Sequence, residues 1–282
     1  MNKTKHVWQD FVNNFFSRRL LFFCIFQFYI LHYYINSVKR FSIAADYPAS
    51  PWILPFVGQN VYFLFIYGIS VIYFYSNIPF MQRNEMYALI REGRKKWVYA
   101  KILRIWMSAV SLSFIEVVLS ILPLFPCLEW TAEWGKLYNS LAMTNAGLEY
   151  NVKLSFSYEL IIEHDPFMTM LIFGIILCIS TGLVGMIMFA VSICVNRTTA
   201  VLMGTFLSVL SVVFANLYLY QQWISFISPF SWMNLLLLYG KVCKNAPSFS
   251  AVIIMAAISV FILSGISLKR IYIKDLDWTD EE

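Results

Sequence analysis

Charged residues are scarce in this chain of 282 residues. Asp, Glu, Lys and Arg together make up 13% of it, against roughly 25% in soluble domains. Apolar residues make up 60%, more than a soluble fold of this length can bury, and disordered chains have the opposite composition. A disordered protein and a cytosolic enzyme are therefore excluded, and the composition predicts an integral membrane protein.

Cysteine and histidine, the residues of disulfide frameworks and metal sites, are also few. The five cysteines are scattered without a CxxC pair, and the three histidines stand far apart. Neither a disulfide scaffold nor a metal site is indicated. Cys127 and Cys243 fall in loops that would share one side of the membrane, and the spacing leaves open whether they form a disulfide.

Catalytic and nucleotide-binding motifs are absent. The chain contains no HExxH and no GxSxG, and neither Gly135-Lys136 nor Gly240-Lys241 is followed by the Ser or Thr of a phosphate loop. We therefore expect no enzyme activity and no cofactor on this chain. The net charge of +5 comes mostly from residues that flank the apolar runs, which indicates membrane topology and no nucleic-acid partner.

Long apolar runs dominate what is present. About 20 residues at 1.5 Å rise cross a bilayer, and six runs have about that length. They are Leu20–Val38, Val57–Ile78, Ile102–Phe125, Phe167–Val195, Ala200–Tyr220 and Ala251–Leu268. We predict an all-α polytopic membrane protein in which residues 1–282 form a single transmembrane domain with six helices in the lipid bilayer.

The 21 Lys and Arg residues indicate the orientation of these helices. Most of them fall at the inner ends of the spans when both termini are cytosolic, and the positive-inside rule favours this topology in a cell membrane. A seventh apolar run, Ile224–Gly240, contains Pro229 and several polar residues. It suits a re-entrant hairpin in the outer region 221–250 better than a full span, but charge alone hardly separates the two.

Two segments outside the spans have amphipathic patterns. In residues 1–19, apolar side chains recur at helical spacing from Trp8 to Phe16, which predicts an interfacial helix in the headgroup plane. A soluble helix packed on a partner is the alternative. The basic cytosolic loop 79–101 carries a short apolar stripe before Gly93. A stripe on so short a helix indicates docking to a protein surface.

The outer loop 126–166 contains a period-two pattern. Apolar or aromatic residues alternate with polar ones from Leu148 to Leu160, after a turn signal at 145–147. Strict alternation predicts a half-buried β-strand, so we expect β character in this loop. The loop is also acidic, which suits either a solvated face or the attraction of a cationic cargo.

Polar residues inside the spans are few. Glu116 is the one acidic residue within a span, and carboxylates in lipid usually face the interior of the bundle. We interpret Glu116, with Gln27 and His32 as weaker candidates, as part of a translocation path. A structural hydrogen bond is the alternative for Glu116. Gly174 and Gly182 belong to a small-residue face, which indicates close helix packing.

The order of these segments resembles that of a known family. An interfacial helix, two spans, a charged cytosolic helix, three spans, an outer hairpin and a last span resemble the membrane subunit of type 2 ATP-binding cassette (ABC) exporters. The sequence EMYALIREGR at 85–94, followed by Ala100-Lys101, is similar to the family pattern of an acidic start, a leucine-containing helix, an arginine and a Gly-Lys pair. Ala100 stands where the family has glycine.

This resemblance implies a pore made with a second, identical or homologous permease, on a separate ABC ATPase subunit that binds ATP and magnesium. Residues 1–19 would be the elbow helix, and 224–240 the outer gate, with Pro229 and Trp232 in it. The loop helix would be the coupling helix that seats in the ATPase. Its contact residues would be Glu85, Met86, Leu89, Ile90, Arg91, Gly93 and Arg94.

Two other classes of protein are alternatives. A non-transporting membrane immunity or sensor protein would bind peptide at the outer loop and a signalling partner at the cytosolic helix. A secondary transporter would use Glu116 without ATP, but the chain has no evident repeated pair of broken helices. For the exporter, peptides, lipids and drug-like molecules are all compatible cargo.

Overall fold

The computed structural model describes residues 15–78, 90, 93–217, 223–240 and 246–273. The described chain folds into helices joined by turns and loops, with an isolated parallel β-bridge between Ala49 and Leu128. Among these residues, five helices are long and apolar enough to cross a membrane. An all-α protein of the multi-pass membrane type was predicted, and the described residues agree with it.

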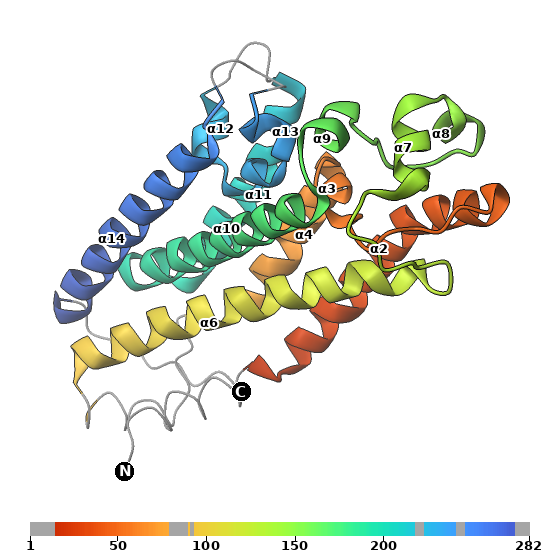
Figure 1. The fold of residues 1–282 in the computed structure, drawn as a ribbon. Coiled ribbons are helices and arrows are strands. Elements are labelled where there is room, and N and C mark those ends of the chain that lie inside the picture. Colours follow the sequence, from red (N-terminus) through yellow and green to blue (C-terminus); the bar gives the residue numbers. More distant parts are fainter. Residues whose placement is uncertain (1–14, 79–89, 91–92, 218–222, 241–245, 274–282) are drawn as a thin grey trace.

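The five long helices form the body of the molecule (Figure 1). They are α2 (Arg18–Ala45), α6 (Arg94–Ile121), α10 (Pro166–Cys194), α11 (Arg197–Leu217) and α14 (Phe249–Ile273). The 3-10 turn η1 (Leu122–Leu124) continues α6. Each of these helices overlaps one of the predicted spans.

The second predicted span is shorter than the sequence suggests. It forms α4 (Val61–Tyr75), which has 15 residues, fewer than the about 20 that cross a bilayer. Asn60 sets its start, because the side-chain oxygen of Asn60 accepts hydrogen bonds from the backbone N–H groups of Tyr62 and Phe63 at 3.0 and 3.2 Å. The residues before this cap form a separate short helix, α3 (Leu54–Val57).

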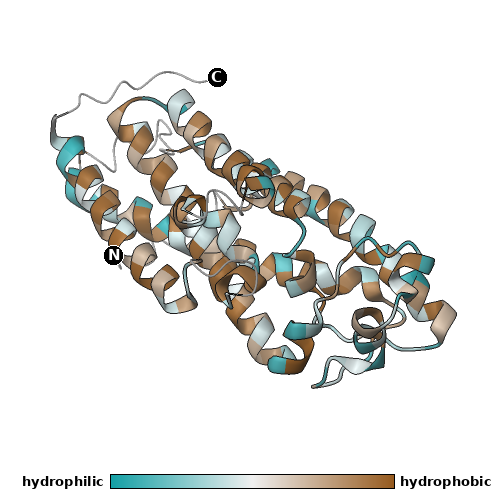
Figure 2. Cartoon of the chain, turned by 90° about the horizontal axis from the view of Figure 1, so that it is seen from above, coloured by the Kyte–Doolittle hydropathy of each residue, from teal (hydrophilic) through white to brown (hydrophobic). Residues whose placement is uncertain are grey.

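Helix α10 is the centre of the bundle. It packs against α4, α6, α11 and α14, and Figure 1 shows it running between α6 and α14. In its most apolar stretch 61% of the residues are buried, against 17% in α14. Helix α14 therefore turns most of its apolar side chains away from the protein, where lipid would cover them. Figure 2 shows apolar residues along the long helices and hydrophilic ones towards their ends and in the loops.

Glycines bring α10 close to its neighbours. A Cβ atom added to Gly182 would lie 2.7 Å from the Trp106 ring of α6, and one added to Gly185 would lie 2.7 Å from Ile105. Both distances are shorter than van der Waals contact allows, so only glycine fits. A Cβ on Gly174 would meet no atom within 4 Å. The small-residue face thus makes its close contact at Gly182 and not at Gly174.

The outer loop is helical, so the predicted β character is wrong. Within it α7 (Gly135–Met143), α8 (Ala146–Glu149) and α9 (Tyr158–Glu163) form a cap at one end of the bundle. The alternation does not follow burial, because Leu148 is 80% exposed whereas Leu160 is 1% exposed. No segment of the described chain pairs with 148–160 as a strand, and a lone strand leaves its backbone groups unsatisfied.

The cap is fastened to the loop that follows α2. The Ser50 hydroxyl donates a hydrogen bond to the carbonyl oxygen of Trp134 at 2.7 Å. The backbone carbonyl oxygen of Ser50 accepts a hydrogen bond from the Tyr138 hydroxyl at 2.5 Å. The Trp52 indole donates to the carbonyl oxygen of Thr131 at 2.9 Å. Burial raises the pKa of Tyr138, which keeps its hydroxyl available as a donor.

The seventh apolar run is broken into three short pieces. They are α12 (Ile224–Ile227), η2 (Pro229–Met233) and α13 (Leu235–Leu238). Pro229 begins η2, and the Asn234 side chain caps α13. None of the three pieces is long enough to cross a bilayer by itself. The η2 turn packs against α4, α10 and α11.

The end of the bundle opposite the cap is its basic end, where α2, α6 and α11 begin and α4, α10 and α14 end. Arginines from the helices that begin there bind the helices that end there. Arg19 donates to the Ser76 hydroxyl, and Arg197 donates to the Ser76 carbonyl oxygen at 2.7 Å. Arg94 donates to the carbonyl oxygen of Ile271 at 2.8 Å. Cations stabilise helix C-termini because the carbonyl groups there carry partial negative charge.

Several predicted features fall outside the described residues. They include the elbow helix up to residue 14, most of the loop 79–101, and Cys243. Cys127 has a free thiol in this structure.

The close approach at Gly182 can be tested with two matched substitutions on α10. We expect Gly182→Ala to lower the thermal midpoint of the detergent-purified chain, because overpacking costs about 1–3 kcal/mol. Gly174→Ala should leave it unchanged or raise it, because alanine gains up to about 1 kcal/mol over glycine in a helix. Equal effects of the two substitutions would show that α10 and α6 are not in contact at Gly182.

Candidate functional site

Glu116 lies at the centre of the candidate site, on the buried stripe of α6. Buried residues of this helix recur every three or four positions, from Ile105 through Leu112 to Ser120, and Glu116 shares their face. The exposed fraction of Glu116 is 0%. Neither of its carboxylate oxygens has a hydrogen-bond partner among the described residues. A charged carboxylate in such a place is costly and calls for a cation or a proton.

Gln27 of α2 is the second buried polar residue that the sequence predicted. It is fully buried, and its side-chain N–H donates to the Ser70 hydroxyl of α4 at 2.8 Å. The Ser70 hydroxyl in turn donates to the carbonyl oxygen of Ile66 at 3.0 Å. The amide oxygen of Gln27 has no partner among the described residues, so Gln27 keeps one unused acceptor.

A hydroxyl pair joins α4 to α10 in the same interior. The Tyr67 and Thr181 hydroxyls lie 2.9 Å apart, and both residues are fully buried. Tyr67 is close enough to Glu116 for the two side chains to interact electrostatically. The same holds for Cys24, which lies about one turn before Gln27 on α2. Four helices thus contribute to one interior polar cluster. Its members are Gln27, Tyr67, Ser70, Glu116 and Thr181.

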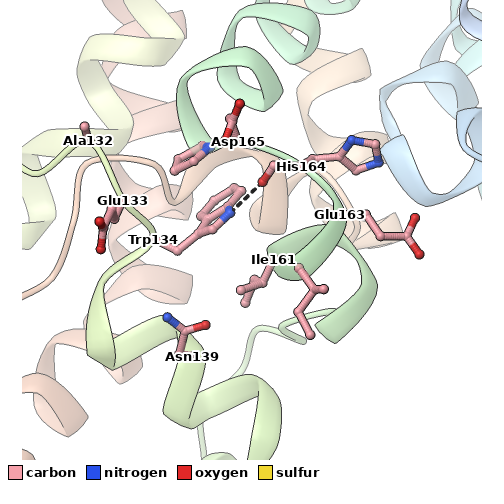
Figure 3. Close-up of a pocket in the computed structure, with 10 residues that line it drawn as sticks. Ala132, Glu133, Trp134, Asn139, Ile161, Glu163, His164 and Asp165 are labelled. Atoms are coloured by element: carbon pink, nitrogen blue, oxygen red, sulfur yellow. Dashed lines mark hydrogen bonds between the residues drawn. The ribbon is translucent and has the colours of Figure 1, made fainter.

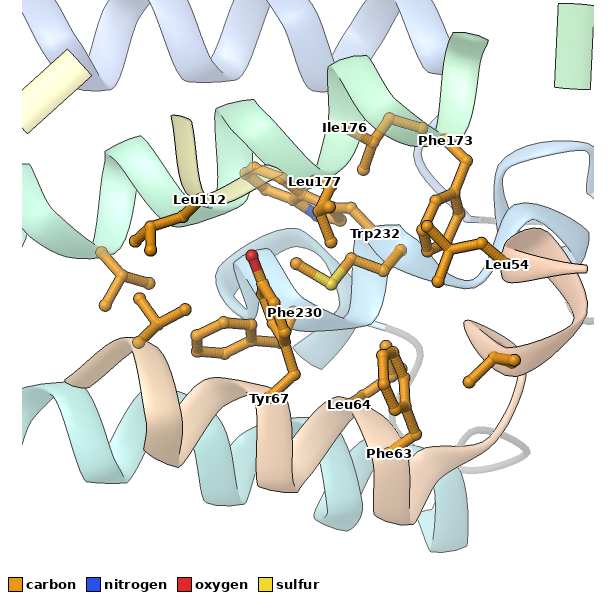
Figure 4. Close-up of a cluster of buried hydrophobic side chains, with 14 of the residues drawn as sticks. Leu54, Phe63, Leu64, Tyr67, Leu112, Phe173, Ile176, Leu177, Phe230 and Trp232 are labelled. Carbon is orange, nitrogen blue, oxygen red and sulfur yellow. The ribbon is translucent and has the colours of Figure 1, made fainter. Parts of the chain in front are cut away.

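The broken segment packs directly against this cluster. The Ser180 hydroxyl donates to the carbonyl oxygen of Pro229 at 2.7 Å, and the Phe230 ring lies 6.5 Å from the Tyr67 ring. Trp232 is 3% exposed and donates its indole N–H to the carbonyl oxygen at position 225 at 2.7 Å. Figure 4 shows Phe230 and Trp232 between α4 and α10. The two predicted gate residues therefore belong to a segment that lies beside the polar cluster.

His32 lies apart from the cluster. Its side chain is exposed on α2 and stacks on Phe28 with 6.1 Å between the ring centroids. It lines a surface pocket at the capped end of the bundle. Of the three residues proposed for a translocation path, the structure therefore brings Glu116 and Gln27 to the interior and places His32 elsewhere.

The described part of the predicted coupling loop consists of Ile90 and the residues from Gly93 onward. Glu85, Met86, Leu89 and Arg91 lie outside the described residues. Ile90 is helical and 71% exposed. The backbone of Gly93 has a φ of 84°, a conformation that glycine adopts easily, and α6 begins at the next residue.

A second candidate region is a pocket of about 340 Å³ in the cap (Figure 3). Acidic residues line it, including Glu133, Glu163 and Asp165. The Trp134 indole crosses the pocket and donates to the carbonyl oxygen of His164 at 2.9 Å. In Figure 3 the Glu133 and Glu163 carboxylates point to opposite sides. Among the described residues no group of three or more His, Cys, Asp and Glu is arranged to hold a metal ion.

Sequence reasoning missed three of the five members of the cluster. Tyr67, Ser70 and Thr181 are polar residues in largely apolar helices. A Ser or Thr hydroxyl in a helix often bonds its own backbone, and a tyrosine in an apolar run is usually a packing residue. The only available signal was that each is a polar side chain inside a predicted span, because none of them shares a helix with Gln27 or Glu116. Which helices face one another depends on the tertiary structure, and the sequence pattern of a single helix does not predict it.

Stability measurements can test whether Glu116 is unpartnered. We expect Glu116→Met to raise the thermal midpoint of the purified chain, because a buried polar group without a partner costs about 1–3 kcal/mol. Ser70→Ala serves as the comparison and should lower the midpoint, since it removes the acceptor of the Gln27 N–H. A loss of stability in Glu116→Met would mean that the carboxyl group has a binding partner inside the bundle.

Comparisons with family models, with curated proteins and with solved structures found no match to this chain. Function must therefore be inferred from the chemistry of the side chains and their arrangement. The features that bear on it are the interior polar cluster, the broken segment beside it, and the connection at Gly93.

Proposed function

We propose that this chain is the permease subunit of an ABC exporter, in which a separate ATPase supplies the energy. The support comes from the arrangement of apolar helices around an interior that holds a buried carboxyl group, and from the resemblance of residues 85–101 to a coupling loop. In this proposal α4 completes a set of six transmembrane helices. The basic end faces the cytosol, together with both termini, as the positive-inside rule favours.

The connection at Gly93 is the observation that carries the proposal. Ile90 exposes an apolar side chain among charged neighbours, as a residue does when it docks on another protein. Gly93 directly precedes α6, and Arg94, the first residue of α6, binds the carbonyl oxygens of Ile271 and Tyr272 at 2.8 and 3.2 Å at the end of α14. A force applied to the loop would therefore reach α6 and α14 together.

The broken segment supplies the outer gate in this proposal. Its η2 turn contains Pro229 and Trp232, and it is held to α10 by the bond between Ser180 and the Pro229 carbonyl oxygen. A movement of α6 or α10 would change its contact with Tyr67 and open the interior towards the capped end. Glu116 and Gln27 would then meet the cargo, because each has an acceptor oxygen without a partner among the described residues.

The proposal implies two partners in the membrane complex. One is an ABC ATPase subunit, which would bind ATP and magnesium, because this chain has no phosphate loop. The other is a second copy of the permease or a homologue, as the resemblance to ABC exporters implies. Peptides, lipids and drug-like molecules are compatible with the apolar and aromatic interior.

A secondary transporter is a second candidate function, and the buried Glu116 is the observation that favours it. A carboxyl group in the bundle interior is suited to carry a proton across the membrane. The two functions differ in their energy source. Uptake or efflux in sealed vesicles that depends on a proton gradient and not on ATP would identify the secondary transporter.

Affinity purification is the first test of the proposed function. We expect the tagged chain, taken from its native membrane in a mild detergent, to bring with it an ABC ATPase at about one copy per permease. The complex should hydrolyse ATP, because the partner carries the catalytic residues. If the chain purifies reproducibly without an ATPase, the exporter proposal is wrong, and the transporter driven by protons becomes the better candidate.

The coupling assignment has a sharper test at Ile90. We expect Ile90→Asp to abolish association with the ATPase, because a charge replaces the apolar docking residue, while expression and membrane insertion stay normal. Ile90→Leu is the matched control and should keep the ATPase bound. Co-purification of Ile90→Asp with the ATPase at the normal ratio would contradict the assignment of this loop.

A further inference from the structure

A basic and aromatic pocket lies where the capped end of α2 meets the loop after α8. Its volume is about 430 Å³. Three tyrosines from these two segments, Tyr29, Tyr33 and Tyr150, line its walls, together with the two cations Arg40 and Lys153. No Asp or Glu is among its lining residues. The pocket therefore combines positive charge with apolar ring surface and contains no acidic group to neutralise the charge.

Hydrogen bonds and ring contacts fix Lys153 in this pocket. Its backbone N–H donates to the Ser37 hydroxyl of α2 at 3.1 Å, and the Ser37 hydroxyl donates to the carbonyl oxygen of Tyr34 at 2.7 Å. The Lys153 ammonium group lies 3.2 Å from the centroid of the Tyr33 ring. A cation over a tyrosine face is attracted by the ring electrons, and it keeps N–H donors available for a further acceptor.

Arg40 brings a second cation to the same pocket. It is exposed, and its guanidinium group has neither a hydrogen bond nor an ion pair with any described residue. The adjacent Lys39, by contrast, is engaged with the carbonyl oxygen of Phe125. The fork of N–H groups on an arginine matches the oxygens of a phosphate group. Arg40 is therefore available to bind an anion in the pocket.

The depth of the pocket along α2 matches the boundary between hydrocarbon and headgroups. Leu20 and Arg40 are about 30 Å apart along the helix axis at 1.5 Å per residue, and the hydrocarbon core is about 30 Å thick. If Leu20 enters the hydrocarbon at the basic end, Arg40 lies at the headgroups of the opposite leaflet. Tyr29 and Tyr33 lie deeper and are 69% and 52% exposed, where acyl chains can contact them.

We propose that this pocket binds the phosphate headgroup of an anionic lipid in the leaflet at the capped end. Arg40 and Lys153 bind the phosphate oxygens, and the acyl chains follow the exposed tyrosine face of α2. The shared chemistry is phosphate recognition, and the apolar wall below the cations favours a lipid over a free phosphate ion. The proposal needs only a membrane-spanning α2, so it stands apart from the proposed transport function.

A lipid titration of the full-length chain tests the proposal. The chain is purified in an uncharged detergent and titrated with dioctanoylphosphatidylglycerol, and bound lipid is counted by native mass spectrometry. We expect Arg40→Gln and Lys153→Gln each to weaken binding roughly fivefold, since one cation near a lipid surface contributes about 1 kcal/mol and about 1.4 kcal/mol is tenfold. Arg40→Lys keeps the charge and should retain most of the binding.

Lys136→Gln is the matched control, because Lys136 is exposed on α7 in the cap and outside the pocket. It removes the same charge and should leave the affinity unchanged. The proposal is overturned if dioctanoylphosphatidylcholine binds as tightly as the glycerol lipid, or if Lys136→Gln weakens binding as much as Arg40→Gln. Inorganic phosphate that displaces the lipid at equal concentration would identify a free-phosphate site and would also overturn it.

Discussion

A peptide backbone in hydrocarbon has no water to bind, so each of its N–H and C=O groups needs a partner within the protein. This constraint explains why α2, α6, α10, α11 and α14 are unbroken helices. It also explains where the chain can leave the helical path. The break before α4 lies next to the cap, and the broken segment from α12 to α13 is enclosed by other helices. Side chains of those helices complete its hydrogen bonds, as Ser180 does for the Pro229 carbonyl oxygen.

The same constraint gives the ionisable residues two different roles. At the basic end, Arg19, Arg94 and Arg197 bind backbone or hydroxyl oxygens at the ends of α4 and α14, so their charges stabilise the packing of the bundle. Glu116 has no such partner among the described residues. A buried carboxyl group without a partner is a good candidate for a functional residue, and the polar residues near it reinforce that interpretation.

The cap is held together by aromatic rings as well as hydrogen bonds. The Phe56 ring lies 5.1 Å from Trp134 and 4.7 Å from Phe156, and Tyr138 stacks on Phe156 at 5.2 Å. Part of the apolar surface of the outer loop is buried around these rings, including Leu137, Leu154 and Leu160. Because the cap rests on the end of α2, the loop after α8 is fixed against that helix. Lys153 is therefore held beside Tyr33 and Arg40, although these residues are far apart in the sequence.

The class of the protein and most of its helices were readable from the sequence. Composition alone predicts a membrane protein, because lipid is the only environment that covers so much apolar surface, and the long apolar runs locate the helices that cross it. Pro229 and the polar residues in Ile224–Gly240 favoured a re-entrant hairpin over a span, and the structure breaks this run into three short pieces. These properties depend on local composition and length, which the order of residues contains directly.

Other features were decided by the tertiary structure. The alternation from Leu148 to Leu160 predicted a strand, but a strand needs a partner, and the fold provides helices α8 and α9 with loops instead. Gln27 and His32 look alike as polar residues in one apolar run, yet Gln27 is buried and His32 is exposed. Which side of α2 meets α4 and α6 depends on the packing of the whole bundle. The sequence by itself therefore determined where most of the long apolar helices lie, because length and composition are local, and the packing of helices far apart in the chain decided which of their side chains meet.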